Sequence, residues 1–405
     1  MRTIVVGATG FVGRHLVPHL AASGNQVTAV ARREPDRPVA GAAEHVALDV
    51  ADEDALTAAL AGNDAAYYLV HSMTGANFRA RDLELATTFG RAAARAGIGR
   101  IVYVGALGDD PGSDHLASRQ EVGVALAAAG VPVVELRAAV VIGSASISFE
   151  MLRYLTERLP FMVCPRWVRT RLQPIALRDL LTYLERSLTV APGVYEIGGA
   201  EVTTYREMIA TYAAVRGLRR RWIVDVPYLT PRLSSYWVDL VTPVDRRVSH
   251  ALIDSLVTEV VVRDPERTEA AFGITPMPVA DAIRDALAEQ EDALAHELLD
   301  RDDGLADGVY AARVAVPLPP GSGPAAAAEL REVGGSYSWY GVALGWRVRV
   351  LAGRLLGERF VLLRPPAPTD GPADGPWRRA PRSTGGPWCT TTTTPRAARR
   401  GLVRG

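Results

Sequence analysis

Three glycines, Gly7, Gly10 and Gly13, follow the first apolar run of the chain in "TIVVGATGFVGRHL". In such a turn the first glycine allows a tight bend, the second gives a pyrophosphate room beside the backbone, and the third lets the next helix pack closely. The helix would direct unpaired N–H groups and its positive dipole end at the phosphates. The alternative is an ordinary strand-to-helix turn with three glycines. We favour a dinucleotide-binding turn, whose predicted contacts are Gly7, Ala8, Thr9, Gly10, Phe11, Val12 and Gly13.

Two arginines, Arg32 and Arg33, end the next apolar run, "QVTAVARREP". An acidic residue at this point would bind the ribose 2′-hydroxyl and select NAD. A guanidinium instead pairs with a phosphate through its planar fork. The pair therefore predicts NADP(H) as the cofactor, with NAD(H) less favoured; the alternative is that one arginine merely faces solvent.

Polar residues also follow the third and fourth apolar runs. Asp49, with Val50 after it in "VALDVAD", stands where a carboxylate can meet an adenine, although it is equally well placed to cap the following helix. His71 and Ser72 close "YYLVHSM". Ligands of open parallel sheets bind at the carboxyl ends of strands, so these two residues are predicted cofactor contacts near the nicotinamide ribose. A capping role for Ser72 is the alternative.

The elements that must position these residues alternate along the first half of the chain. Strands are expected near 2–6, 26–31, 45–48, 65–70, 100–105 and 131–136. Helices are expected near 11–23, 52–61, 76–97 and 116–129. Alternating strands and helices predict βαβ crossovers, hence an α/β fold with a doubly wound parallel Rossmann sheet. Strand cores such as "TIVVG" and "PVVELR" are nearly continuous in apolar residues, as strands buried on both faces are.

The composition narrows the class of protein. The chain has 405 residues, 48% hydrophobic residues and no net charge, which argues against a nucleic-acid partner. All 45 basic residues are arginine, so lysine chemistry is excluded. The two cysteines, Cys164 and Cys389, form no metal or redox spacing, and no metal site is expected. Without a signal pattern or a membrane-spanning run, the expected location is the cytoplasm.

The second half is expected to contain three further regions. From about 137 to 290 shorter helices and many prolines predict a small cap on the substrate side of the sheet, completing a first domain over 1–290. Arg166, Arg169 and Arg171 in this cap would suit an anionic substrate, although a solvated loop is the favoured interpretation. A partial second α+β domain is predicted over 305–357. The Pro-, Arg- and Thr-rich stretch 358–405 is predicted to be disordered, whether as a basic tail or as an out-of-frame end.

Several longer blocks extend the pattern of the glycine turn: "YYLVHSM", "RIVYVGALG", "SDHLASRQEVG", "SFEMLRYLTERLPFMVCPRWV", "QPIALRDLL" and "PYLTPRLSSYWVDLVTPV". With the G-x-x-G-x-x-G turn, they resemble the atypical branch of the short-chain dehydrogenase/reductase superfamily over about residues 1–290. More narrowly, they look like an NmrA/epimerase-like subgroup of bacterial NAD(P)-binding oxidoreductases of unknown substrate. In that subgroup a helix-grip-like domain commonly follows, and "GGSYSWYGVALGWRVRVLAGRLLG" is similar to its beginning.

The resemblance also shows where this chain departs from the superfamily, whose reductases carry Tyr-x-x-x-Lys on the helix before the sixth strand and a serine after the fifth. The lysine position falls on Arg119 and the tyrosine position on His115, one helical turn earlier. Gly105 and Ala106 stand at the serine position. His115 is a candidate proton donor and Arg119 a candidate contact for ribose or phosphate oxygens. The alternative for His115 is a capping or surface histidine; a nearby arginine would lower its pKa and favour the neutral ring, which makes it a poorer acid at pH 7.

The expected function is NADP(H)-dependent hydride transfer to a small-molecule substrate: a carbonyl, quinone or enone. The absence of the usual Ser-Tyr-Lys set leaves turnover uncertain and keeps a non-catalytic NADP(H)-binding regulator or redox sensor as the alternative. An epimerase- or isomerase-like reaction is less favoured because it too needs proton-transfer residues. The oligomeric state is left open.

Overall fold

The computed structural model describes the chain from residue 1 to residue 299, with four gaps. The gaps are residue 36 and residues 72–76, 109–113 and 227–257. All described residues belong to one unit, Met1–Arg301. The predicted second domain (305–357) and tail (358–405) lie outside the described residues.

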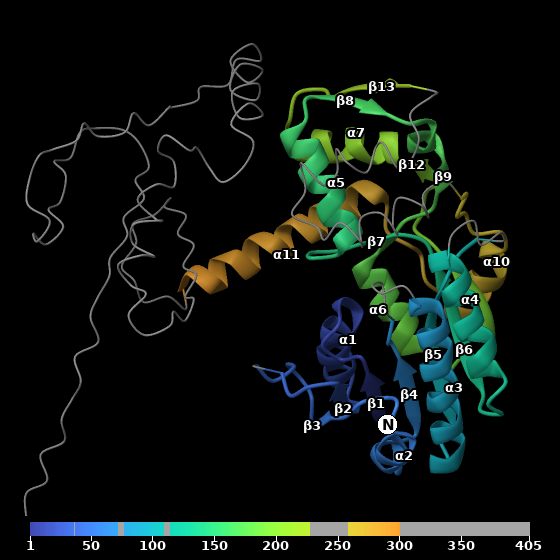
Figure 1. Cartoon of the computed structure of the whole chain (residues 1–405). Coiled ribbons are helices and arrows are strands. Elements are labelled where there is room, and N and C mark those ends of the chain that lie inside the picture. Colours follow the sequence, from blue (N-terminus) through green and yellow to red (C-terminus); the bar gives the residue numbers. More distant parts are fainter. Residues whose placement is uncertain (36, 72–76, 109–113, 227–257, 300–405) are drawn as a thin grey trace, which may run out of the picture. The chain divides into compact units, whose positions relative to one another are not determined.

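A parallel sheet of seven strands forms the centre of this unit (Figure 1), in the order β11-β6-β5-β4-β1-β2-β3. The strands are β1 (Arg2–Val6), β2 (Gln26–Ala31), β3 (Glu44–Ala47), β4 (Ala65–Tyr68), β5 (Arg100–Ala106), β6 (Val133–Ala138) and β11 (Gly193–Ile197). From β1 the chain winds outward to β2 and β3 on one side, and then through β4, β5 and β6 on the other. The predicted doubly wound Rossmann sheet is confirmed, and its direction of winding changes between β1 and β4.

Helices cover both faces of the sheet. One face packs on α1 and α6, and the other on α2, α3 and α4. Their bounds are α1 (Phe11–Ala22), α2 (Glu53–Leu60), α3 (Phe78–Ala96), α4 (Asp114–Ala127) and α6 (Leu177–Arg186). Each expected helix from the first half of the chain is present within a few residues of its predicted ends. In α6, Leu177, Leu180 and Leu184 recur at helical spacing and are buried, which explains why this segment lies on the sheet.

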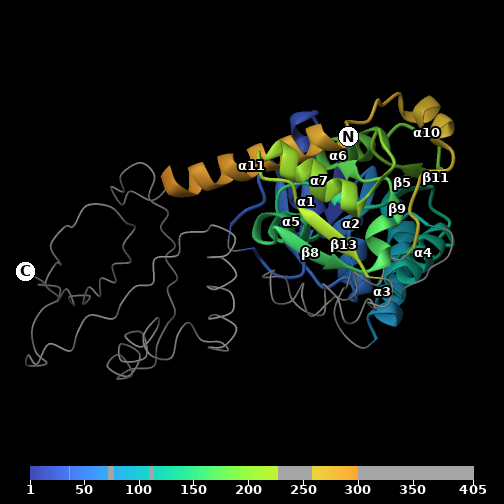
Figure 2. The same ribbon diagram turned by 90° about the horizontal axis from the view of Figure 1, so that it is seen from above.

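The remaining elements form mainly a layer beyond the carboxyl ends of the strands (Figures 1 and 2). They are β7 (Val141–Ile142), α5 (Ile147–Arg158), β8 (Phe161–Cys164), η1 (Arg166–Arg169), β9 (Arg171–Leu172), β10 (Ile175–Ala176), β12 (Thr203–Thr204), α7 (Tyr205–Val215), β13 (Trp222–Asp225), α10 (Pro265–Phe272) and α11 (Val279–Leu299). A separate apolar core joins α5, α7 and α11. We call α5, α7 and the short strands around them the cap.

The sequence analysis missed one strand of the sheet. Residues 193–197 form β11, which pairs in parallel with β6 from Gly193 opposite Val134 to Ile197 opposite Ala138. The chain therefore returns from the cap to the sheet through α6 and β11 before it builds α7. Consequently the segment that follows β6 contains both sheet and cap elements.

Candidate functional site

The glycine turn has the geometry that its sequence predicted. Gly7 has φ +93°, a left-handed conformation that favours glycine, and a Cβ there would meet the carbonyl oxygen of Leu69 at 2.9 Å. A Cβ on Gly13 would collide with the Gly7 carbonyl oxygen and lie 2.7 Å from Ala8 Cα. Gly10 is the N-cap of α1 and has no side chain to occupy the helix end. The turn therefore leaves the N-terminus of α1 without a side chain over it.

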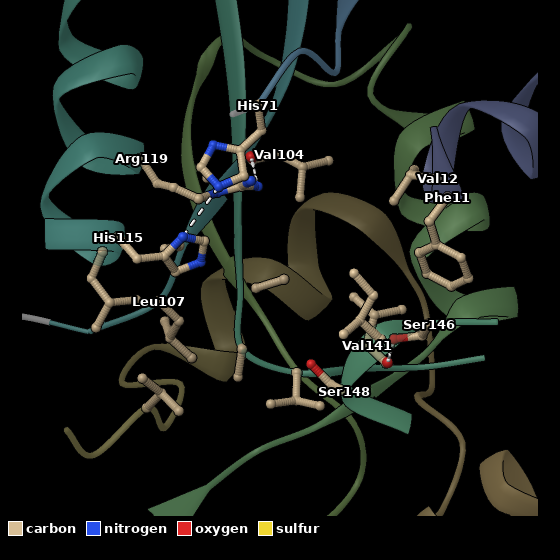
Figure 3. A pocket seen from close by; sticks show the side chains of 18 of the residues that line it. Phe11, Val12, His71, Val104, Leu107, His115, Arg119, Val141, Ser146 and Ser148 are labelled. Atoms are coloured by element: carbon tan, nitrogen blue, oxygen red, sulfur yellow. Dashed lines mark hydrogen bonds between the residues drawn. The ribbon is translucent and has the colours of Figure 1, made fainter. Parts of the chain in front are cut away.

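One cavity of about 450 Å³ connects this turn with the cap. Its wall is formed on one side by the glycine turn and on the other by the ends of β4 and β5 together with α4 (Figure 3). Among the predicted site residues it includes Gly7, Gly10, Phe11, Val12, Gly13, His71, His115 and Arg119. The cavity thus brings together the predicted cofactor turn and both predicted catalytic residues.

Two histidines and a buried aspartate form a hydrogen-bonded chain at one side of the cavity. Nδ1 of His71 lies 2.9 Å from Oδ2 of Asp82, a residue of α3 with an exposed fraction of only 1%. Nε2 of His71 lies 3.1 Å from Nδ1 of His115 on α4. Figure 3 shows the two rings in contact, with the second nitrogen of His115 facing away from His71. The hydroxyl of the buried Ser118 donates to the same Asp82 oxygen over 3.3 Å.

The surroundings of the two histidines keep both rings neutral. Burial is the main cause that lowers the pKa of His71; its hydrogen bond to Asp82 opposes this, and the charge of Arg119 adds to it. Burial, then His71 and then Arg119, lower the pKa of His115 to about 3. Arg119 lowers the pKa of His115, as expected of a nearby arginine, but by less than burial does. At neutral pH His115 is therefore an uncharged imidazole.

Arg119 lies over the end of β5. Its guanidinium donates to the carbonyl oxygen of Val104, and its guanidinium carbon is 5.9 Å from the centre of the Tyr103 ring. The Tyr103 hydroxyl in turn donates to the Arg119 carbonyl oxygen over 2.9 Å. Burial raises the pKa of Tyr103 to about 12. Arg119 thus contributes a fixed positive charge to the cavity wall.

Of the two residues at the serine position, Gly105 has no room for a side chain, whereas Ala106 is buried and carries a Cβ. A Cβ on Gly105 would lie 2.5 Å from Oε1 of Glu135, and one on Gly123 would lie 2.5 Å from Oε2 of the same carboxylate. Glu135 is buried on β6, and its Oε1 is 2.8 Å from Nε of Arg137. A buried ion pair therefore occupies the space beside the end of β5.

The remaining predicted cofactor residues lie away from this cavity. Arg32 and Arg33 are exposed directly after β2. Val50 is buried after β3, and Asp49 accepts a hydrogen bond from the N–H of Ala51 over 3.0 Å. The cap of α2 is Asp52, which accepts from the N–H of Ala55, so the alternative of Asp49 as a helix N-cap is wrong.

Four other predicted positions can be placed: Ala8, Thr9, Arg169 and Arg171. Ala8 lines a second cavity, of about 210 Å³, beside β2 and β3, and Thr9 is exposed. Ser72 lies outside the described residues. In the cap, Arg171 lines the main cavity and its guanidinium is 3.2 Å from Oε1 of Glu259, while Arg169 is exposed.

Sequence reasoning missed Asp82 and the apolar wall of the cap. Asp82 is one acidic residue in a charged helical segment, and its only sequence signal is that it lies on the buried face of α3 with Leu85, Ala86 and Phe89. The cap residues have no motif. They come together as a cavity wall only when α5, β9 and α7 pack against one another.

Comparison with known proteins defines the class of this domain. Residues 7–138 match a family described as NAD(P)H-binding. Together with the glycine turn and the sheet, this match shows that the chain contains an NAD(P)-binding Rossmann domain.

One curated protein and several solved structures are similar to this chain. The mitochondrial NADH dehydrogenase [ubiquinone] 1 alpha subcomplex subunit 9 of Dictyostelium discoideum is 26% identical over 224 residues, which are 51% of this chain and 61% of that protein. The chain therefore matches less than two thirds of that relative's length. WbmG of Bordetella bronchiseptica, solved with NAD and UDP, has a TM-score of 0.57 at 18% identity, covering 72% of this chain and 96% of its own. A nucleoside-diphosphate-sugar epimerase from Staphylococcus aureus has a TM-score of 0.57 at 14% identity, covering 70% and 99%.

The described residues lack two kinds of feature. None of their helices combines the length and apolar character that crossing a membrane requires. They also contain no group of three or more His, Cys, Asp or Glu side chains with metal-binding geometry.

Proposed function

We propose that this chain is an NADP(H)-dependent oxidoreductase that exchanges a hydride with a small, uncharged carbonyl, quinone or enone in the cytoplasm. The observation that carries the proposal is the single cavity that joins the glycine turn to His115, Arg119 and the cap. A cofactor held at the turn and a substrate held under the cap would share this space. When bound, the nicotinamide would supply or accept the hydride.

The residues of the chain have separate roles in this proposal. The N-terminus of α1 and the glycine turn would hold the pyrophosphate. Arg119 would attract ribose or phosphate oxygens through its fixed charge. His115 would contact the reacting oxygen, and the buried walls would exclude water from it.

The cap side of the cavity favours an uncharged substrate. Met151, Leu152, Leu172 and Ile209 line it and are each at most 6% exposed. Apolar walls bind apolar groups well, and Arg171, the arginine of the cap in this lining, already pairs with Glu259 over 3.2 Å. This argues for a carbonyl, quinone or enone with an apolar body, and against a diphosphate such as the UDP with which WbmG was solved.

The preference for NADP(H) rests on Arg32 and Arg33. Both are exposed just past the end of β2, where a guanidinium is free to meet the 2′-phosphate. Hydrogen bonds to charged groups contribute about 1.5–3 kcal/mol each. Removing both arginines should therefore weaken NADPH binding by at least about tenfold.

A fluorescence titration tests this preference. NADPH and NADH are titrated into wild type, the double variant Arg32→Ala/Arg33→Ala and the control Arg178→Ala, which removes an exposed arginine of α6. The expected result is a selective loss of NADPH affinity in the double variant. Equal affinity of the wild type for the two cofactors would contradict the assignment.

A turnover assay tests the reaction. NADPH oxidation is followed with a panel of apolar aldehydes, quinones and enones and with UDP-glucose, using wild type, His115→Ala and the control His45→Ala. We expect turnover of an apolar compound, loss of activity in His115→Ala and none with UDP-glucose. Unchanged activity in His115→Ala would remove this histidine from the reaction.

The pKa of His115 favours a second candidate function. With a pKa of about 3, only about one ring in 10⁴ is protonated at pH 7, so the ring by itself is a poor proton donor. A non-catalytic NADP(H)-binding regulator would need no donor. Tight NADPH binding without turnover on any member of the panel is the result expected of a regulator.

A further inference from the structure

The hydrogen bonds around His71 fix which ring nitrogens carry protons. Asp82 as a carboxylate can only accept, so Nδ1 of His71, 2.9 Å away, carries a proton. In a neutral ring the other nitrogen, Nε2, then holds a lone pair. Its neighbour 3.1 Å away, Nδ1 of His115, must therefore donate.

It follows that Nε2 of His115 is unprotonated. This nitrogen is on the side of the ring away from His71 (Figure 3), and His115 is part of the cavity wall. The cluster consequently presents a lone pair, not an N–H, to a molecule in the cavity. A substrate hydroxyl is the group that such a nitrogen binds.

We propose that Asp82, His71 and His115 form a proton relay, in which Asp82 is the group that stores the proton exchanged with the substrate oxygen. The inference deepens the proposed function and rests on it. In this relay His115 is the residue that contacts the substrate, whereas His71 and Asp82 act through it.

The proton steps balance without forming a charged imidazole. In the direction of alcohol oxidation, the substrate O–H bond breaks and its proton binds Nε2 of His115. The Nδ1 proton of His115 passes to Nε2 of His71, and the Nδ1 proton of His71 passes to Asp82. Both rings end neutral in the other tautomer and Asp82 ends as a carboxylic acid. The relay moves protons only, and the accompanying hydride is exchanged with the nicotinamide of the proposed function.

Burial makes the relay more favourable than storage of the proton on a ring. The same burial that lowers the pKa of both histidines penalises an imidazolium at this place. A neutral carboxylic acid carries no such penalty. In the direction of carbonyl reduction, water in the cavity first gives a proton to Nε2 of His115 and the relay carries it to Asp82; the acid form of Asp82 then returns that proton to the substrate oxygen along the same path, so the low pKa of His115 does not prevent proton donation.

The groups that face Asp82 are consistent with this role. Tyr68 at the end of β4 and Tyr103 on β5 lie close enough to feel its charge, and burial raises the pKa of each. Both phenols therefore stay neutral across the useful pH range. The charge of Arg119 lowers the pKa of both histidines. Ser118 donates a hydrogen bond to the Asp82 carboxylate.

The first test measures the tautomers and needs no catalysis. Nitrogen-15 NMR of the wild type distinguishes protonated from unprotonated ring nitrogens in the chain's seven histidines, with His71→Gln and His115→Gln used to assign signals. The relay requires the same tautomer in both rings: an N–H at Nδ1 with a lone pair at Nε2 while Asp82 is a carboxylate, or the reverse in both rings while Asp82 holds the proton. Opposite tautomers in the two rings, or two protons on one ring, would overturn the proposal, and because the wild type is measured, this holds even if a variant does not fold.

The second test is kinetic and uses Asp82→Asn, which keeps the size of the side chain but cannot store the proton. Its matched control is Asp179→Asn, another buried aspartate, which accepts from the N–H of Met277 on a different part of the molecule. We expect Asp82→Asn to lower kcat by about 10²-fold or more, as loss of acid–base catalysis does, and to abolish the pH dependence of kcat. NADPH affinity should stay unchanged, because the glycine turn is untouched.

The outcomes separate the two proposals. Wild type that turns over no substrate refutes the proposed function, and with it the catalytic role of the relay. Wild type that is active, together with Asp82→Asn of unchanged kcat and pH profile, overturns the relay alone. Equal losses of kcat in Asp82→Asn and Asp179→Asn would indicate a merely structural role and would also overturn it.

Discussion

Removal of His115 should make the protein more resistant to mild acid. Its pKa is about 3 in the folded chain, against 6.5 for an exposed histidine. The unfolded state therefore binds a proton between these values that the folded state does not. Because protons favour the state that binds them, stability is lost as the pH falls below about 6.5. The lowered pKa of His71 acts in the same direction.

The magnitude follows from the two pKa values. Between pH 7.5 and pH 5.0 an exposed histidine becomes almost fully protonated, whereas a group with a pKa of 3 hardly changes. At about 1.36 kcal/mol per pH unit, the cost to the free energy of unfolding is about 2 kcal/mol. With an m-value of about 2 kcal/mol/M, this corresponds to a shift of about 1 M in the urea midpoint.

Urea unfolding at the two pH values measures the effect in wild type, His115→Gln and His45→Gln. His45 is an exposed histidine on β3 and serves as the control. Other groups also contribute to the acid sensitivity of the wild type, so the informative quantity is the difference between variants. His115→Gln should lose about 2 kcal/mol less than wild type and less than His45→Gln. Equal losses in all three proteins would refute a buried, neutral His115.

Two further predictions concern the glycines around the cavity. Gly13→Ala places a Cβ against the backbone of Gly7 and Ala8, which cannot move aside as a side chain can. We therefore expect thermal unfolding to show a destabilisation of about 1–3 kcal/mol. Fluorescence titration should show weaker NADPH binding. Gly105→Ser introduces a serine at this position, but its Cβ would meet the Glu135 carboxylate. The variant should be less stable than wild type and should have no higher kcat. A gain in kcat would contradict the packing described above.

The sheet was predictable because its signal is local. Buried parallel strands are runs of apolar residues, and glycine turns and amphipathic helices separate them, so that the order of elements and most of their ends follow from the sequence. β11 was not predicted because "GVYEI" is short and its residues alternate in burial like those of a surface strand. Only its pairing with β6 assigns it to the sheet.

The two halves of the site were predictable to different degrees. The glycine turn is a contiguous motif whose geometry depends on its own residues. The histidine cluster is assembled from the end of β4, from α3 and from α4, so its members are up to 44 residues apart. His71 and His115 were each found from their positions relative to a strand or helix. Their contact, and the aspartate behind them, are properties of the packing.

This packing changes what the loss of the reductase residues implies. A tyrosine with a neighbouring lysine donates a proton from one side chain to the substrate. Here the Glu135 carboxylate, paired with Arg137, lies where a side chain on Gly105 would be, and a neutral histidine stands at the position that the resemblance gives to tyrosine. A single histidine with a pKa of about 3 would be a weaker donor than the tyrosine it replaces. Linked through a second ring to a buried carboxylate, it no longer needs to hold the proton itself, and the chemistry then depends on Asp82, a residue that no superfamily motif marks.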